Sequence, residues 1–248
     1  MRWTWQNLLL GLGLFLAGWI ALAVLIDRAI LPYPWQVIPI FFAQLPGELG
    51  HHFLVSAFRV LAAIAVAVVL AVPAGLGLGQ IKALDRLFYP VIAIVHPIPK
   101  IVFLPVILVL FGSGDGSKIF LIVLILFFQI LVVVRDAAAG LRPELIQSVR
   151  SLGAGRRALF RYVYMPASLP AVLTALRISV GTAVAVLFIA ETYATQSGLG
   201  YYIVVRTWQA LRYPEMYAGI LAMGILGFAY YVVIDLLERR YNRWRQPE

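Results

Sequence analysis

The chain has 248 residues, of which 62% are hydrophobic and only 12% are charged. An ordinary soluble domain is about 45–50% apolar and about 25% charged, so this composition excludes a water-soluble single-domain enzyme, and its hydrophobicity excludes a disordered chain. It is typical of a protein that crosses a membrane several times. The net charge of +9 resembles that of nucleic-acid binders, but in a membrane protein it more often reflects basic cytoplasmic loops, and we expect no nucleic-acid partner.

Six windows are long and apolar enough to cross about 30 Å of hydrocarbon, which takes about 20 residues. They are Trp3–Ile26, Val60–Ile81, Leu87–Gly114, Ile119–Val134, Ala171–Ala190 and Met216–Ile234. We therefore predict an all-α, polytopic membrane protein with six transmembrane helices, in which residues 1–248 form one transmembrane domain.

The first window could also be read as a signal peptide, because Arg2 precedes an apolar run and Ala21-Leu-Ala23 resembles a cleavage site. The run is long enough to span the membrane and five more spans follow. This favours an uncleaved first helix.

Lysine and arginine are distributed unequally between the two sides of the predicted spans. An even number of spans places both termini on one side, which also receives thirteen basic residues: Arg2, Lys82, Arg86, Arg135, Arg142, Arg150, Arg156, Arg157, Arg161, Arg239, Arg240, Arg243 and Arg245. The other side receives five: Arg28, Arg59, Lys118, Arg206 and Arg212. Basic loops stay in the cytoplasm, so we predict that both termini are cytoplasmic.

Two connections are long. Asp27–Arg59, on the outer side, contains four prolines among aromatic residues, and we expect it to rest in the membrane interface. Arg135–Pro166, on the cytoplasmic side, contains Pro143 at the start of a predicted short helix. The apolar face of that helix recurs at helical spacing and consists of Leu145, Ile146, Val149 and Leu152.

Gly153 and Gly155 end this short helix, and a second short stripe follows before Pro166 and Pro170 mark the start of the next span. Each half has about nine residues, or roughly 14 Å of helix, which cannot cross a bilayer. We predict a helix, a glycine elbow and a second helix at the cytoplasmic surface. By itself the pattern fits either an interfacial hairpin whose arginines contact anionic lipid or a docking knob for a cytoplasmic partner.

The residues of this loop also form a motif. Gln147-Ser-Val-Arg-Ser-Leu-Gly153, followed by Val163-Tyr-Met-Pro166, resembles the signature loop of membrane permeases in ATP-binding-cassette importers. That signature reads Glu-Ala-Ala, three residues, Gly, nine residues, then Ile-x-Leu-Pro. The glycine falls on Gly153 and the nine-residue gap is kept, whereas Gln147-Ser148-Val149 replaces Glu-Ala-Ala.

Three further segments resemble the nitrate, sulfonate and taurine branch of these permeases, and the resemblance covers roughly residues 30–240. They are Pro97-Ile-Pro-Lys-Ile-Val-Phe-Leu-Pro105 with Phe111-Gly and Ser117-Lys-Ile119, Ala190-Glu-Thr with Ser197-Gly-Leu-Gly-Tyr201, and Ser56-Ala-Phe-Arg-Val60 with Val72-Pro-Ala-Gly75.

The resemblance implies a type I importer permease and its partners. Two permease copies form the pore in the bacterial inner membrane, two ATPase subunits bind beneath them, and a periplasmic binding protein delivers the substrate. The signature loop is implied to be the helix that couples the pore to the ATPase. The residues that it assigns to this role are Gln147, Arg150, Leu152, Gly153, Ala154, Gly155, Arg156 and Pro166.

Three charged residues in or beside the spans are candidates for the substrate pathway. Lys100 lies within a window broken by prolines, where it could contact an anion or snorkel to the surface. Arg177 lies about two turns inside the fifth span and suits a gate or a structural pair better than a substrate contact. Glu191 ends the same span, where a structural ion pair is favoured over proton coupling.

No catalytic residue, metal site or nucleotide site is expected. The chain has no cysteine and only His51, His52 and His96 as histidines, so thiolate sites are excluded and an intramembrane enzyme lacks a nucleophile and base pair. The glycine-rich Gly112–Lys118 departs from a phosphate-binding loop because Ser117 precedes its lysine. ATP and Mg²⁺ would therefore bind to the partner ATPase.

The implied cargo is a small anion such as a sulfonate, taurine or nitrate. Near relatives of this branch also carry thiamine-precursor pyrimidines or riboflavin, so import of one of these compounds is the alternative cargo. A stand-alone ion-coupled carrier is a less favoured alternative function, because the docking loop would then have no role.

Overall fold

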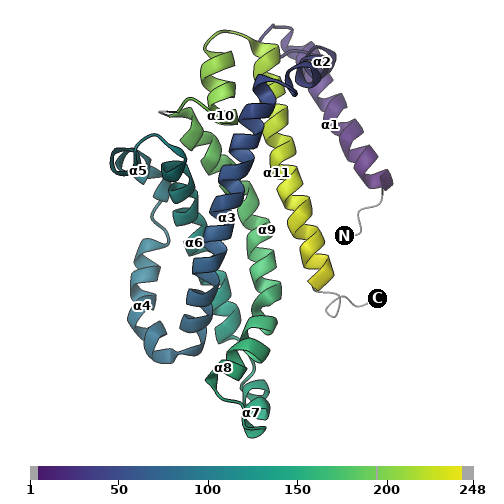
Figure 1. The fold of residues 1–248 in the computed structure, drawn as a ribbon. Coiled ribbons are helices and arrows are strands. Elements are labelled where there is room, and N and C mark those ends of the chain that lie inside the picture. The colour runs from purple at the N-terminus through teal and green to yellow at the C-terminus, as the bar shows by residue number, and fades with distance from the viewer. Residues whose placement is uncertain (1–4, 194, 242–248) are drawn as a thin grey trace. The chain divides into compact units, whose positions relative to one another are not determined.

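The computed structural model describes residues 5–193 and 195–241, and every regular element in that part of the chain is helical (Figure 1). The chain divides into two compact units. One combines Met1–Ser56 with Glu191–Leu226, and the other combines Ala57–Ala190 with Gly227–Glu248. That residues 1–248 form one domain stays a prediction.

The prediction of an all-α polytopic protein is confirmed. Within the described residues, five helices are long and apolar enough to cross a membrane: α1 (Trp5–Ile26), α3 (Glu48–Gln80), α6 (Asp115–Ala139), α9 (Met165–Thr192) and α11 (Tyr213–Tyr241). The remaining predicted window, Leu87–Gly114, falls on a bent pair. Its first limb is α4 (Lys82–Val95), and the second is η1 (Lys100–Phe103) followed by α5 (Leu104–Phe111), at 79° to the first.

The outer stretch predicted to rest in the interface is mostly helical. α2 (Pro34–Gln44) begins with Pro34 in its first turn, where a missing N–H costs nothing, and the Gln36 side chain accepts a hydrogen bond from the Tyr33 N–H at 3.0 Å. The helix that contains the second predicted span, Val60–Ile81, begins earlier than the apolar window, because α3 starts at Glu48. Arg59, the charged residue that bounds the apolar window, lies within α3 and is buried.

In the first unit, aromatic contacts hold the connection after α1. The Trp19 indole donates a hydrogen bond to the Pro32 carbonyl at 3.0 Å, and its ring stacks on Tyr217 with centroids 5.9 Å apart. After α9 the chain forms the short α10 (Leu199–Tyr201) and continues as the π-helical η3 (Tyr202–Trp208).

In the second unit, α6 forms the centre of the core. Its buried side chains recur every three or four residues and include Leu121, Ile122, Leu126, Ile130 and Val134. α3 packs directly on α6 through glycines four residues apart, a spacing of small residues that lets two helices approach closely. A Cβ on Gly75 would lie 2.9 Å from the Leu131 carbonyl oxygen, and one on Gly79 would lie 2.5 Å from that of Arg135.

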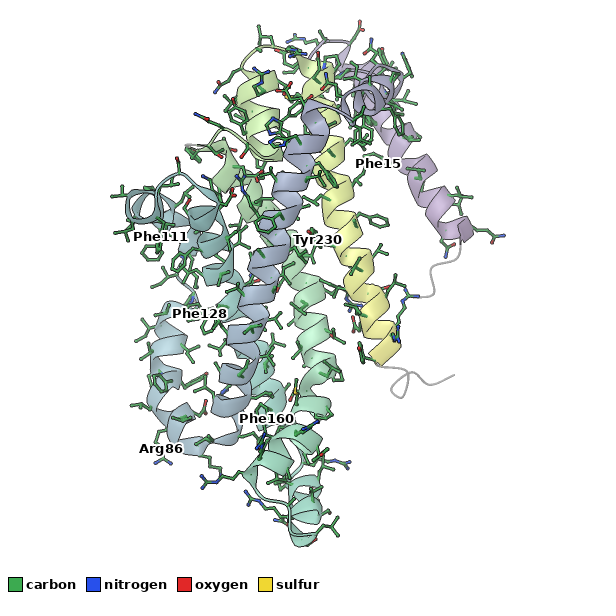
Figure 2. The ribbon with its side chains drawn as sticks, viewed as in Figure 1. Phe15, Arg86, Phe111, Phe128, Phe160 and Tyr230 are labelled. Atoms are coloured by element: carbon green, nitrogen blue, oxygen red, sulfur yellow. The ribbon has the colours of Figure 1, made fainter. Side chains whose placement is uncertain are left out.

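The two limbs of the bent pair run to opposite ends of this unit. Arg86 on α4 and Phe160 lie toward one end, while Phe111 on α5 lies toward the other (Figure 2). The first of these ends also carries α7 (Pro143–Ser151), which follows α6 after a three-residue connection. We refer to it as the α7 end.

Candidate functional site

The predicted short helix and glycine elbow are present at the α7 end. α7 starts with Pro143 in its first turn and stops at Ser151. Gly153 then adopts φ +84°, and its N–H donates to the Arg150 carbonyl at 2.9 Å. A Cβ at Gly153 would meet no atom within 4 Å. Glycine is therefore required here by the left-handed backbone and not by lack of space.

α7 packs on almost nothing. None of its nine residues, all of which lie in the described part of the chain, is buried, and Leu152 at its end is 85% exposed. Gln147, Arg150 and Arg156 are exposed as well. A rigid turn that presents a large apolar side chain between basic residues is a surface suited to another protein.

The second half of the predicted motif differs from the prediction. α8 (Arg156–Leu159) is not a separate nine-residue helix but continues through the π-helical η2 (Phe160–Tyr164) directly into α9. Pro166 has no N–H to donate, and the wider π turn before it, in which the Met165 N–H donates to the Phe160 carbonyl, accommodates that gap. The elbow is thus joined to a membrane helix without a flexible linker, since Ala154 and Gly155 alone lie between.

Lys100 lies at the break of the bent pair and is only 8% exposed. Its ammonium donates to the carbonyls of Val95, His96 and Ile98 at 3.1, 3.0 and 3.2 Å, and it lies 4.7 Å from the centre of the Phe128 ring. Pro99 has no N–H to donate to the Val95 carbonyl four residues before it, and the break of the helix leaves the other two carbonyls without a regular helical partner. The structure therefore places Lys100 as a cap on α4, where it satisfies the groups that the break exposes.

Arg177 lies between α9 and α11, among acidic side chains. One guanidinium nitrogen lies 3.1 Å from the Glu238 carboxylate and 3.6 Å from that of Asp235. Thr174 donates to Glu238 at 3.1 Å, and Arg239 pairs with Asp235 at 2.8 Å. This network ties the two helices together and provides the structural pairing expected for Arg177.

Glu191 is fully buried in the first unit. Its carboxylate accepts hydrogen bonds from the Ser56 hydroxyl at 2.9 and 2.8 Å and from the Gly200 N–H at 2.9 Å. The Leu199 N–H donates to Ser56 Oγ at 2.8 Å, and the Gly198 N–H donates to His52 Nδ1 at 3.0 Å. Three consecutive backbone donors at the start of α10 are thereby satisfied by side chains, two of them on α3.

Sequence reasoning missed His52 and Ser56 as partners of this loop. The signal was present, because the two residues lie four apart on one face of α3, and Ser56 opens one of the motifs quoted above. Beside them, the Tyr202 hydroxyl donates to the Gln44 side chain. Burial raises the pKa of Tyr202 to about 12, so this phenol stays a neutral donor at neutral pH.

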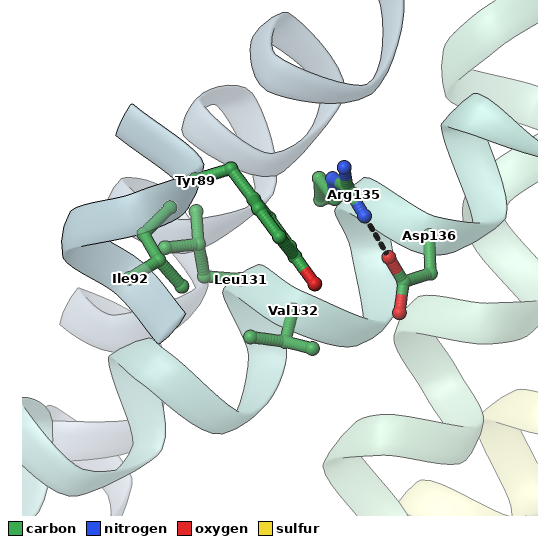
Figure 3. Close-up of a pocket in the computed structure, with 6 residues that line it drawn as sticks. All are labelled: Tyr89, Ile92, Leu131, Val132, Arg135 and Asp136. Carbon is green, nitrogen blue, oxygen red and sulfur yellow. Dashed lines mark hydrogen bonds and ion pairs between the residues drawn. The ribbon is translucent and has the colours of Figure 1, made fainter. Parts of the chain in front are cut away.

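A second network that the sequence did not reveal centres on Arg135, one turn before the end of α6. Its guanidinium binds both carboxylate oxygens of Asp85 at 2.7 and 2.6 Å and that of Asp136 at 2.7 Å. The Tyr89 ring lies 4.5 Å from the guanidinium carbon. Tyr89, Arg135 and Asp136 line a hollow of about 110 Å³ together with Ile92, Leu131 and Val132 (Figure 3).

The family can be stated from sequence comparison. The profile of the family described as "Binding-protein-dependent transport system inner membrane component" matches residues 67–243, which is more than half of the chain. The chain belongs to this permease family.

The permease is 29% identical over 258 residues to the taurine transport system permease protein TauC of Escherichia coli, across 98% of this chain and 94% of that one. It is 27% identical over 247 residues to the putative aliphatic sulfonates transport permease protein SsuC of Bacillus subtilis, across 98% and 89%. These relatives confirm the resemblance to the nitrate, sulfonate and taurine branch.

The fold has a solved counterpart. A chain of the MetNI methionine ABC transporter, determined in inward-facing conformations, matches with a TM-score of 0.69 and 22% identity, across 78% of this chain and 96% of that one. At this identity the likeness concerns the fold alone, and it supports the type I importer architecture expected from the sequence.

Proposed function

We propose that the permease is the membrane subunit of an ATP-driven importer, and that a separate cytoplasmic ATPase binds α7 and its glycine elbow. The observation that carries this proposal is a nine-residue helix with no buried residue, ended by an 85%-exposed leucine and fixed by a left-handed glycine. Within the described residues, the contact of α7 with α8 covers this knob only in part and leaves its outer face free for a partner. The knob is connected to α6 on one side and, through α8 and η2, to α9 on the other. A movement of the knob can therefore be transmitted to two membrane helices.

The residues that would contact the ATPase are those exposed on this knob. Leu152 would fill an apolar pocket, while Arg150 and Arg156 would meet acidic groups at its rim. Gln147 takes the place of the family's glutamate and can offer a neutral hydrogen bond where the family has a charge. The left-handed Gly153 would set the angle of the knob, Ala154 and Gly155 would join it to α8, and Pro166 would fix the π turn behind it.

The remaining parts of the importer follow from the proposal. Two copies of the permease would enclose the pathway, two ATPase subunits would hold ATP and Mg²⁺, and a periplasmic binding protein would deliver the substrate. The α7 end would face the cytoplasm, as the thirteen basic residues on that side predict. Three of those residues, Arg2, Arg243 and Arg245, lie outside the described residues.

We propose taurine or another small sulfonate as the cargo. The support is the naming of two relatives as permeases for taurine and aliphatic sulfonates. Roles for Lys100, Arg177 and Glu191 in the substrate pathway stay predictions. Each of these side chains makes structural contacts within its own unit.

Reconstitution into liposomes tests the function. The permease alone should move no taurine, whereas the permease with its ATPase, external binding protein and ATP enclosed in the liposomes should accumulate it. A thiamine-precursor pyrimidine offered as a competitor should not reduce that uptake. Taurine flux through the isolated permease would contradict the importer, and uptake of the pyrimidine instead of taurine would contradict the cargo alone.

A further inference from the structure

α4 is weakly packed compared with the rest of its unit. All fourteen of its residues are described and none is buried, and Leu87, Val91 and Ile94 are each more than half exposed. In contrast, α6 buries ten residues. The hollow between Tyr89 and Ile92 on α4 and Leu131 and Val132 on α6 leaves the two helices incompletely packed (Figure 3). Side-chain packing therefore does little to make α4 follow a movement of α6.

The Arg135 guanidinium supplies the missing connection. It binds Asp85 through two parallel hydrogen bonds and lies against the ring of Tyr89, and these two residues are one turn apart on α4. A bidentate arginine–carboxylate pair fixes direction as well as distance, because both partners are planar. The third contact of the guanidinium, with Asp136, is made to the same helix and keeps Arg135 oriented.

The position of this clamp links it to the knob. Only Gly140, Leu141 and Arg142 separate α6 from α7, and Arg135 lies five residues before that connection. Asp85 is in the first turn of α4, at the end of the unit that α7 also occupies. A displacement of α7 can enter the membrane helices through the end of α6 or, past the elbow, through α9. On the α6 route, the Arg135–Asp85 pair lies directly on the way to α4.

We propose that Arg135 and Asp85 are coupling residues outside the signature loop, which transmit the movement of the docked knob from α6 to α4. The proposal rests on the proposed function, since it needs the ATPase to move the knob. Asp85 and Tyr89 act on α4, Arg135 acts on α6, and Asp136 serves as a positioning residue only. The far end of α4 can follow without exposing carbonyl groups to lipid, because Lys100 keeps them bonded at the break.

Two fluorescent reporters test the clamp, since the permease has no cysteine of its own. One complex carries a bimane on Leu87→Cys in α4 and the other on Val133→Cys in α6, both at exposed positions, with an ATPase free of cysteine. In the otherwise unchanged complex, ATP should alter the emission of both. In Asp85→Asn the α6 response should persist, while the α4 response falls about fivefold, as expected for loss of one partly exposed ion pair.

Two matched variants separate transmission from general damage. Asp136→Asn removes an equally close carboxylate from Arg135 but leaves the connection to α4 in place, so it should lower the α4 response far less than Asp85→Asn does. Asp85→Glu keeps the charge and should retain most of the response. An unchanged α4 response in Asp85→Asn would overturn the clamp and leave the docking function standing. Silence of both reporters in the otherwise unchanged complex would overturn the docking function and the clamp together.

Discussion

Two of the loops that turn on a glycine with positive φ have opposite surroundings. At Gly153, φ is +84° and a Cβ would meet no atom within 4 Å. At Gly198, φ is +107° and a Cβ would lie 2.2 Å from the Glu191 carboxylate. The loop at Gly198 is closed on its own unit by buried hydrogen bonds, whereas the elbow at Gly153 is shaped for contact with something outside the chain.

Replacing these two glycines should therefore affect different properties of the permease. A change in the closed loop should reduce the stability of the permease itself. A change in the open elbow should leave stability nearly intact and act on coupling to the ATPase.

The largest effect is expected for Gly198→Ala. The new methyl group would overlap the Glu191 carboxylate, and the left-handed backbone adds strain, so together they should destabilise by about 3 kcal/mol. Thermal unfolding of the purified permease in detergent would show this as a clear loss in Tm. Gly181→Ala, where a Cβ meets no atom within 4 Å, is the control and should not lower Tm. Equal Tm values for the two variants would refute the crowded site.

Glu191→Gln should come second, at about 2 kcal/mol. The amide keeps the size of the side chain but replaces a charged acceptor with one whose NH₂ group would face the donors of Ser56 and Gly200. The same thermal measurement applies, with Glu144→Gln on the exposed α7 as the matched control. If both variants unfold at the wild-type temperature, the carboxylate does not hold the loop.

Gly153→Ala should cost about 1 kcal/mol at the elbow, because a residue with a Cβ disfavours the left-handed backbone. Tm should change little, while stimulation of the ATPase by the permease should fall. Gly155→Ala is the matched control, since Gly155 has φ −76° and equally open surroundings. Reduced stimulation in both variants to the same degree would show that backbone conformation at Gly153 is not what matters.

The smallest effect is expected for Ser179→Ala. It removes one interhelical hydrogen bond at 3.3 Å to Gln129, and such bonds in membrane proteins average about 0.6 kcal/mol. The expected change in Tm lies near the limit of detection. A loss as large as that of Gly198→Ala would mean that α6 and α9 depend on polar contacts far more than on packing.

The spans and the elbow could be predicted because each depends on local sequence. Long apolar windows identify the membrane helices, and Pro143 followed by Gly153 marks a short helix and its left-handed end. The course of the chain after Gly155 could not be predicted. Pro166 suggested the start of a helix. The structure instead has a π turn before Pro166 that lets the helix continue through this residue, and the local sequence carries no signal for such a turn.

The polar networks could not be predicted because they depend on partners distant in sequence. Glu191 and Ser56 are separated by 135 positions, and Arg135 and Asp85 by 50. Counting Arg135 among the basic residues of a loop hid its partner, although Asp85 lies in another loop on the same predicted side. The early start of α3 could not be predicted for the same reason. An ion pair of a buried residue, such as that of Arg59 with Asp115, lets a helix continue through charged residues at which the apolar window stops.

The most direct test of the central claim is the reactivity of one cysteine, introduced as Leu152→Cys into the naturally cysteine-free chain. A maleimide should label it rapidly in the isolated permease and slowly in the complex with the ATPase, whereas Arg86→Cys, at the same end of its unit but away from the knob, should react at similar rates in both. Protection of the Leu152→Cys variant alone is the result that ATPase docking on α7 predicts. Equal labelling of that variant with and without the bound ATPase would contradict it.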